Sequence, residues 1–113
     1  MHEMSLTEGI VELVEEEARK GAFSKVKVIR LEVGMLSQIS PDSLLFCFDA
    51  ISRGSIAEGA KLDIISVPGE GWCMDCAQTV ALSERFDPCP ICGNFHVQMT
   101  SGSEMRLREL EVE

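Results

Sequence analysis

The first 20 residues place apolar side chains at the spacing of an amphipathic helix. Ser5 and Glu8 form a capping-box pattern, and the charged residues that follow gather on the face opposite the apolar one. Gly21 is a typical residue just beyond a helix end. We therefore expect a helix over about residues 6–20, with an apolar face made by Leu6, Ile10, Leu13 and Val14.

A second helical pattern begins after Ser40, which is a favourable N-cap residue followed by Pro41. Apolar residues then recur with i, i+3, i+4, i+7 spacing at Leu44, Cys47, Phe48 and Ile51, and Gly54 follows the end. Cys47 lies within this apolar stripe. We interpret it as a buried core thiol, with a redox or metal-ligand role as the alternative.

Three stretches have the composition and alternation of strands: residues 25–33, 61–67 and 104–112. In the first, the apolar positions change phase between Val28 and Ile29, which indicates a bulge or burial of both faces. The second stops at Pro68-Gly69. The third also has a spacing that suits a short helix.

Two Cys-x-x-Cys pairs separated by twelve residues interrupt this pattern. Two such loops supply the four thiolates of a closed tetrahedral zinc site, which would be structural because no position stays open for water or substrate. A disulfide pair or a redox motif is the alternative. The expected ligands are Cys73, Cys76, Cys89 and Cys92.

These elements predict an α+β fold, in which a small three-stranded sheet has two helices on one face and an inserted four-cysteine zinc ribbon or knuckle. Residues 1–69 and 100–113 would form an α/β domain, and residues 70–99 the zinc-binding knuckle domain.

Composition narrows the function. The 113 residues carry 10 basic and 19 acidic side chains, a formal charge of -9, which disfavours nucleic-acid binding. We expect a cytoplasmic protein, because the start lacks a secretory signal, no apolar run reaches membrane-spanning length, and the cysteine pattern suits a reducing interior. We find no nucleophile–base pair, so we do not expect an enzyme.

His2 is the second candidate for chemistry. The Met1 α-amine, the His2 backbone nitrogen and the imidazole Nδ1 can close paired five- and six-membered chelate rings, a nearly planar donor set that suits Ni(II) or Cu(II). The alternative is an exposed terminal histidine without a metal role. Glu3 is adjacent and is a possible further ligand. His96 is the other histidine, and we interpret it as a surface or knuckle-packing residue.

The chain resembles the HypA/HybF family of hydrogenase nickel-insertion proteins. The resemblance rests on the doubled Cys-x-x-Cys and on three segments: Met-His-Glu-Met-Ser-Leu at the start, Val-Gly-Met-Leu-Ser-Gln-Ile-Ser-Pro-Asp-Ser-Leu at 33–44, and Ser-Gly-Ser-Glu-Met-Arg-Leu-Arg-Glu-Leu-Glu-Val at 101–112. It covers essentially the whole chain. One departure is Gly34-Met35-Leu36-Ser37, where the family often has Gly-Glu-Leu-Ser.

The resemblance implies a metallochaperone that delivers Ni(II) as transient cargo during maturation of nickel–iron hydrogenase; some family members also serve the maturation of urease. It implies nickel bound around His2 in the α/β domain and structural Zn(II) on the four cysteines. The implied partners are a HypB-type P-loop GTPase and the hydrogenase large-subunit precursor, with no nucleic acid or membrane. We expect a monomer or weak homodimer. A zinc-ribbon module for protein or nucleic-acid interaction is the competing function.

Overall fold

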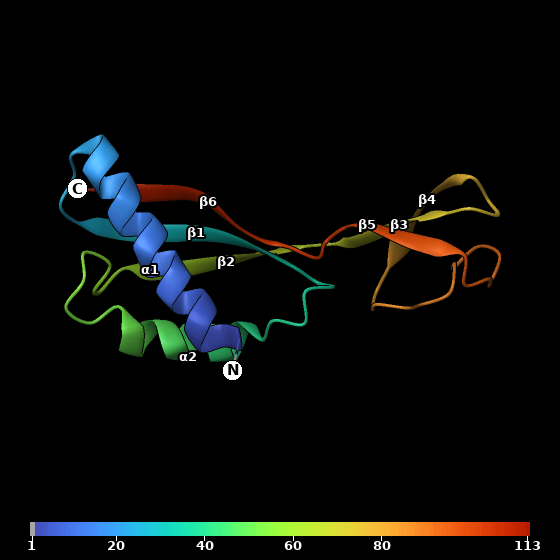
Figure 1. Cartoon of the computed structure of the whole chain (residues 1–113), viewed down its shortest axis with the longest axis horizontal. Coiled ribbons are helices and arrows are strands. Elements are labelled where there is room, and N and C mark those ends of the chain that lie inside the picture. The colour runs from blue at the N-terminus through green and yellow to red at the C-terminus, as the bar shows by residue number, and fades with distance from the viewer. Residues whose placement is uncertain (1) are drawn as a thin grey trace. The chain divides into compact units, whose positions relative to one another are not determined.

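The computed structural model describes the backbone of residues 2–113 and the side chains from Glu3 onward. The order of its elements is α1 (His2–Gly21), β1 (Val26–Gly34), α2 (Pro41–Ile51), β2 (Lys61–Val67), β3 (Gly69–Cys73), β4 (Gln78–Leu82), β5 (Val97–Ser101) and β6 (Met105–Val112). The strands form two sheets of three, with orders β2-β1-β6 and β4-β3-β5 (Figure 1).

The chain divides into two compact units. The first contains Met1–Leu31, Ile39–Ile64 and Leu107–Glu113, and the second contains Glu32–Gln38 and Ile65–Arg106. The loop that follows β1 therefore belongs to the same unit as the cysteine pairs. The assignment of nickel to one domain and zinc to the other remains a prediction.

In the first unit, the two helices pack against the three-stranded sheet. In Figure 1, α1 passes across β6, β1 and β2, and α1 also packs against α2. Ile29 and Leu31 of β1 and Leu44 of α2 are buried in this core. Burial of these apolar side chains is the main driving force for the arrangement. The predicted α+β fold, with two helices, a three-stranded sheet and a four-cysteine cluster, is confirmed.

Helix α1 begins four residues earlier than the capping-box pattern predicts. Ser5 lies exposed inside the helix, and the first turn is held by contacts that the local pattern does not reveal. The Thr7 hydroxyl donates to the Glu3 carbonyl at 2.5 Å, and Glu3 Oε2 accepts the Ser40 backbone N–H at 3.3 Å. The second contact joins positions 37 residues apart, so tertiary structure extends the helix beyond its local start signal.

The buried stripe of α1 also differs from the predicted one. Leu13 is 46% exposed, and Val11 takes its place inside. The buried stripe has i, i+3, i+4, i+7 spacing and keeps Ile10 and Val14 from the predicted face, but it includes the small polar Thr7 in the core. Its members are Thr7, Ile10, Val11 and Val14.

Helix α2 and the remaining elements of the first unit follow the sequence prediction closely. Ser40 has extended backbone angles, φ -81° and ψ 116°, and its side chain accepts the Ser43 N–H at 3.3 Å, so it is the N-cap. Cys47 is buried as predicted and is a free thiol. The predicted third strand is β6 (Met105–Val112) and not a short helix, and residues 61–67 form β2 as predicted.

The predicted knuckle region contains a complete small sheet, which the sequence analysis did not anticipate. Strand β3 pairs with β4 in antiparallel register, Gly69 opposite Leu82 and Cys73 opposite Gln78. It also pairs with β5, with an irregularity between Glu70 and Gly71. Its core contains Leu36, Cys73, Val80, Leu82 and Cys89.

A crossing of two glycines fixes the loop after β1. Leu36 N–H donates to the Gly102 carbonyl at 2.8 Å, and Gly34 N–H donates to the Glu104 carbonyl at 2.9 Å. A Cβ on Gly34 would lie 2.0 Å from the Gly102 carbonyl oxygen, and Gly102 has a φ of 88°. Only glycine at position 34 permits this close approach.

Candidate metal centre

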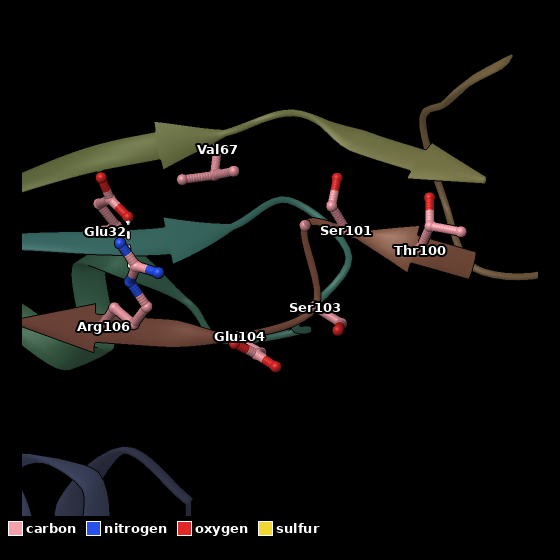
Figure 2. Close-up of a pocket in the computed structure, with 8 residues that line it drawn as sticks. Glu32, Val67, Thr100, Ser101, Ser103, Glu104 and Arg106 are labelled. Atoms are coloured by element: carbon pink, nitrogen blue, oxygen red, sulfur yellow. Dashed lines mark ion pairs between the residues drawn. The ribbon is translucent and has the colours of Figure 1, made fainter. Parts of the chain in front are cut away.

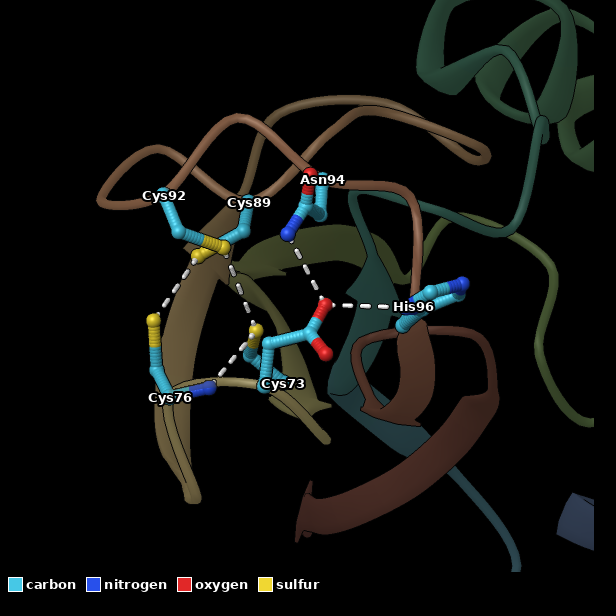
Figure 3. A network of polar contacts seen from close by, with 7 residues as sticks. Cys73, Cys76, Cys89, Cys92, Asn94 and His96 are labelled. Carbon is cyan, nitrogen blue, oxygen red and sulfur yellow. Dashed lines mark hydrogen bonds and ion pairs between the residues drawn. The ribbon is translucent and has the colours of Figure 1, made fainter.

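Two turns bring the four predicted zinc ligands together. Cys73 ends β3 and Cys76 follows in the turn that leads to β4, whereas Cys89 and Cys92 occupy a second turn ahead of β5. Figure 3 shows the four sulfurs pointing toward one another across the two turns. All four ligand atoms lie within 4.8 Å of one another.

The spacing of the sulfurs matches a tetrahedral metal site. Cys73 Sγ lies 3.7 Å from Cys92 Sγ, and Cys76 Sγ lies 3.9 Å from Cys89 Sγ. A tetrahedron with metal–sulfur bonds of about 2.3 Å has edges of about 3.8 Å. These separations are far beyond the roughly 2.05 Å of a disulfide bond. All five cysteines are free, so the disulfide alternative is wrong for this structure.

Backbone N–H groups of the two turns donate hydrogen bonds to two of the cysteine sulfurs. The Cys76 N–H donates to Cys73 Sγ, and the Ile91 N–H donates to Cys89 Sγ, each at 3.4 Å. These two bonds, one in each turn, favour sulfur in its charged form. The site thus supplies partial positive charge around its anions, in addition to any ion that it holds.

The four thiols influence one another strongly. A hydrogen bond from the Cys92 backbone, with a further one from Ile91, lowers the pKa of Cys89 to about 7 against the effect of burial. The side chain of Cys92 and desolvation raise the pKa of Cys76 to about 12. Four neighbouring thiolates repel one another unless a cation compensates them. The donor set therefore fits a soft or borderline dication such as zinc.

A polar bridge joins the two turns beside the sulfurs. Asp75, between the first two cysteines, accepts a hydrogen bond from Asn94 Nδ2 at 3.1 Å, and the same oxygen lies 2.8 Å from His96 Nδ1. In Figure 3, dashed lines from Asn94 and His96 meet at one carboxylate oxygen, outside the group of four sulfurs. The structure thus gives His96 a packing partner within the knuckle, in keeping with our interpretation of it.

The structure describes only part of the predicted nickel site. Met1 and the side chain of His2 lie outside the described residues, so their arrangement stays a prediction. The backbone of His2 is the first residue of α1. Glu3 is half-buried, and its carboxylate contacts Ser40 as described above.

Another hollow, of about 220 Å³, is a weaker candidate site. It is lined by the end of β5 and the loop that follows it, by Glu32 and by Arg106 (Figure 2). Arg106 Nε lies 3.6 Å from Glu32 Oε1, so its positive charge is already compensated. We therefore assign no anion site to this hollow.

No helix in the described part of the chain is long and apolar enough to cross a membrane.

Comparison with known proteins shows similarity over the whole length of the chain. Residues 1–112 match the family model described as hydrogenase/urease nickel incorporation, metallochaperone, hypA. The hydrogenase maturation factor HypA of Methylocella silvestris is 60% identical over 113 residues, covering all of both chains. HypA 2 of Bradyrhizobium diazoefficiens is 55% identical with the same coverage.

Solved structures show the same likeness in three dimensions. The solution structure of the Ni metallochaperone HypA from Helicobacter pylori superposes with a TM-score of 0.72 at 28% identity, covering 97% of this chain and 96% of that one. A second HypA solution structure has a TM-score of 0.73 at 30% identity. These matches confirm the predicted metallochaperone class, which is not a class of enzymes, and the chain belongs to the HypA family of nickel-incorporation proteins for hydrogenase maturation.

Proposed function

We propose that this protein carries Ni(II) at its N-terminus and keeps a separate Zn(II) ion on its four cysteines as a structural element. The observation that supports the zinc assignment best is the pair of Sγ–Sγ separations, 3.7 and 3.9 Å, which fit the edges of a four-sulfur tetrahedron. A closed site of this kind exchanges its ion slowly. The transient cargo therefore needs a different set of ligands.

The start of α1 suits the proposed nickel ligands. The first four backbone N–H groups of a helix have no intrahelical acceptor, and His2 is the first residue of α1. Its amide nitrogen can therefore lose its proton to a metal without breaking a helical hydrogen bond. Together with the Met1 amine and the imidazole Nδ1, it would provide three nitrogen donors to a planar Ni(II) ion.

Glu3 has a supporting role in this proposal. Its Oε2 receives the Ser40 N–H, which ties the first turn of α1 to the N-cap of α2. This contact fixes the position of that first turn. A direct bond from Glu3 to nickel would compete with the Ser40 contact, so we place Glu3 second to the three nitrogen donors.

The experiment that tests the nickel site changes the terminus and leaves the fold intact. One glycine added before Met1 moves the free amine and breaks the paired chelate rings. Ni(II) affinity, measured by calorimetric titration of zinc-loaded protein, should fall at least as far as in His2→Ala, with zinc content unchanged. Unchanged nickel affinity in both variants would contradict the proposal and move the site to His96 or the cysteines.

We further propose that the cargo passes to the large-subunit precursor of a nickel–iron hydrogenase, in the cytoplasm, with a HypB-type P-loop GTPase as partner. Family membership and the names of the relatives support this direction. We propose urease as a second recipient of the nickel, which the family description supports. Ligands at a chain end can be exchanged one at a time, and a transfer reaction requires that. We also propose a monomer or weak homodimer.

The competing function, a nucleic-acid-binding zinc ribbon, makes an opposite prediction. The formal charge of -9 repels phosphate, so the protein should show no salt-sensitive binding to DNA or RNA oligonucleotides at physiological salt. A fluorescence-anisotropy titration with labelled oligonucleotides distinguishes the metallochaperone from a nucleic-acid-binding zinc ribbon. Submicromolar, salt-dependent binding would favour the competing function.

A further inference from the structure

Two phenylalanine side chains of the second unit are largely exposed to solvent. Phe86 is 89% exposed and Phe95 is 71% exposed, and Met35 nearby in the same unit is 54% exposed. We name Met35, Arg85, Phe86 and Phe95 the Phe86 surface. Exposed aromatic rings that adjoin hollows are typical of protein-binding surfaces.

Two pockets adjoin the Phe86 surface, and Arg85 and Phe86 line both. One, of about 230 Å³, reaches the apolar side chains Leu82, Val97 and Met99, beside Phe95. The other, of about 340 Å³, lies against Met35, Leu36 and Gln38. Leu82 and Leu36 belong to the buried core of this unit, so each hollow leads from an exposed ring to the apolar interior. Each has room for an apolar side chain from a partner.

The backbone holds Phe86 in an unfavourable conformation. Its φ is 68°, in the left-handed region that bulky side chains rarely adopt. The Glu84 N–H donates to Asp87 Oδ2 at 3.0 Å, and the Asp87 N–H donates to the Glu84 carbonyl at 3.3 Å, so the turn is closed on both sides of the ring. Because this turn is already closed, the backbone that carries the ring loses little conformational freedom when a partner covers it.

Arg85 supplies a charge next to this ring. Its Nε donates to the Leu36 carbonyl at 2.5 Å, and across the described residues the guanidinium forms no ion pair. The other arginine of the second unit, Arg106, is paired with Glu32. With Nε bound to the protein, the two terminal nitrogens of Arg85 remain for an external acceptor. The guanidinium fork matches a carboxylate geometrically.

We propose that the Phe86 surface binds a protein segment in which an apolar side chain lies next to a single carboxylate. The apolar group enters a pocket beside Phe86, and the carboxylate pairs with Arg85. Glu84 and Asp87 flank Arg85 in the sequence and repel additional negative charge, which favours one carboxylate over an acidic run. This surface is a docking site separate from the metal ligands and does not depend on nickel binding at the N-terminus.

A matched pair of peptides tests the chemistry of the site. The probes are acetyl-Leu-Phe-Asp-amide and its uncharged isostere acetyl-Leu-Phe-Asn-amide, titrated into zinc-loaded, full-length protein and followed by NMR amide shifts. Shifts should centre on residues 35–38, 82–87 and 95–99. The acidic peptide should bind about tenfold more tightly, because a charge-assisted hydrogen bond is the stronger one. Equal affinities, or shifts centred elsewhere, would overturn the proposal.

Two variants assign the effect to residues. Arg85→Gln should reduce the affinity for the acidic peptide to that for its isostere. Phe86→Gly should weaken both peptides severalfold and leave the unfolding temperature unchanged or raised, because glycine accepts the positive φ. Phe46→Ala and Arg53→Gln, an exposed ring and an exposed arginine of the first unit, are the controls and should bind both peptides normally. If Phe86→Gly keeps its zinc and binds both peptides like the unchanged protein, the surface is not the binding site.

Discussion

Asp75 Oδ2 lies 2.8 Å from His96 Nδ1 and 3.1 Å from Asn94 Nδ2, so one oxygen of the first cysteine turn joins residues that follow the second turn. The His96 carbonyl also accepts the Met74 N–H at 2.9 Å. This bridge holds the two halves of the candidate zinc site together from outside the ring of sulfurs. Because His96 Nδ1 takes part in this bridge, a variant of His96 can distinguish packing within the knuckle from binding of the metal.

We expect Asp75→Ala to speed zinc release severalfold, because it removes both side-chain contacts and leaves the sulfurs in place. Release to a chromogenic chelator measures the rate. His96→Ala should keep one zinc per chain and change the unfolding temperature only slightly, since this exposed pair is worth at most about 1 kcal/mol. Loss of the zinc ion in His96→Ala would instead identify the histidine as a ligand.

Each of the four knuckle cysteines should be required for full zinc retention, because the loss of one thiolate opens a closed coordination shell. Elemental analysis of alanine variants at Cys73, Cys76, Cys89 and Cys92 measures this. The matched control is Cys47→Ala, in the core of the first unit, which should retain zinc and lose on the order of 1 kcal/mol of stability. Loss of zinc from the Cys47→Ala protein would contradict the assignment of the four knuckle cysteines as the complete set of zinc ligands.

Gly34→Ala should destabilise the second unit by about 3 kcal/mol, the upper end of the usual cost of overpacking. The added Cβ would lie 2.0 Å from the Gly102 carbonyl oxygen, and that is backbone, which cannot move aside as a flexible side chain would. Chemical denaturation of zinc-loaded protein gives the free energy. Gly9→Ala, where a Cβ meets nothing within 4 Å, is the control and should be neutral or stabilising.

A change of stability with pH should follow from Glu111. Its hydrogen bond with Arg30, together with the charge of that arginine, lowers the pKa of the Glu111 carboxyl. A lowered folded-state pKa stabilises the fold above the unfolded-state value of about 4.3, and that contribution disappears as pH falls through the folded-state pKa. Glu111→Gln should therefore lower the unfolding temperature at pH 7 and match the unchanged protein near pH 3.

The control for this effect is Glu12→Gln, an exposed position on α1, which should show no comparable pH-dependent difference. A Glu111→Gln penalty of equal size at both pH values would mean that packing, and not the ion pair, is responsible. Differential scanning calorimetry at several pH values distinguishes the two.

Nickel binding should also depend on pH, and the loss of affinity should begin at a higher pH than for a site of carboxylates alone, whose pKa values lie at about 4. The proposed amine, amide and imidazole donors must lose their protons to coordinate, so affinity should fall steeply below neutral pH. The absorption spectrum of the complex should show a planar, nitrogen-rich site without thiolate charge-transfer bands. Strong thiolate bands would place the nickel on the cysteines.

The sequence alone determined the elements whose signals are local. The N-cap at Ser40, the strand over residues 61–67 and the burial of Cys47 follow from side-chain chemistry and spacing, which neighbouring residues set. The two cysteine pairs also predict their own cluster, because two Cys-x-x-Cys turns together supply the four thiolates of one tetrahedral metal site.

Tertiary structure decided what depends on distant partners. The extension of α1 back to His2 accompanies the contact of Glu3 with Ser40, and the glycine crossing at Gly34 needs a second chain segment at Gly102. The rings of Phe86 and Phe95 are adjacent to one pocket although nine positions separate them in the chain. Local patterns indicate which residues favour a turn or a helix. Only long-range packing determines which surfaces are buried against each other and which remain exposed to a partner.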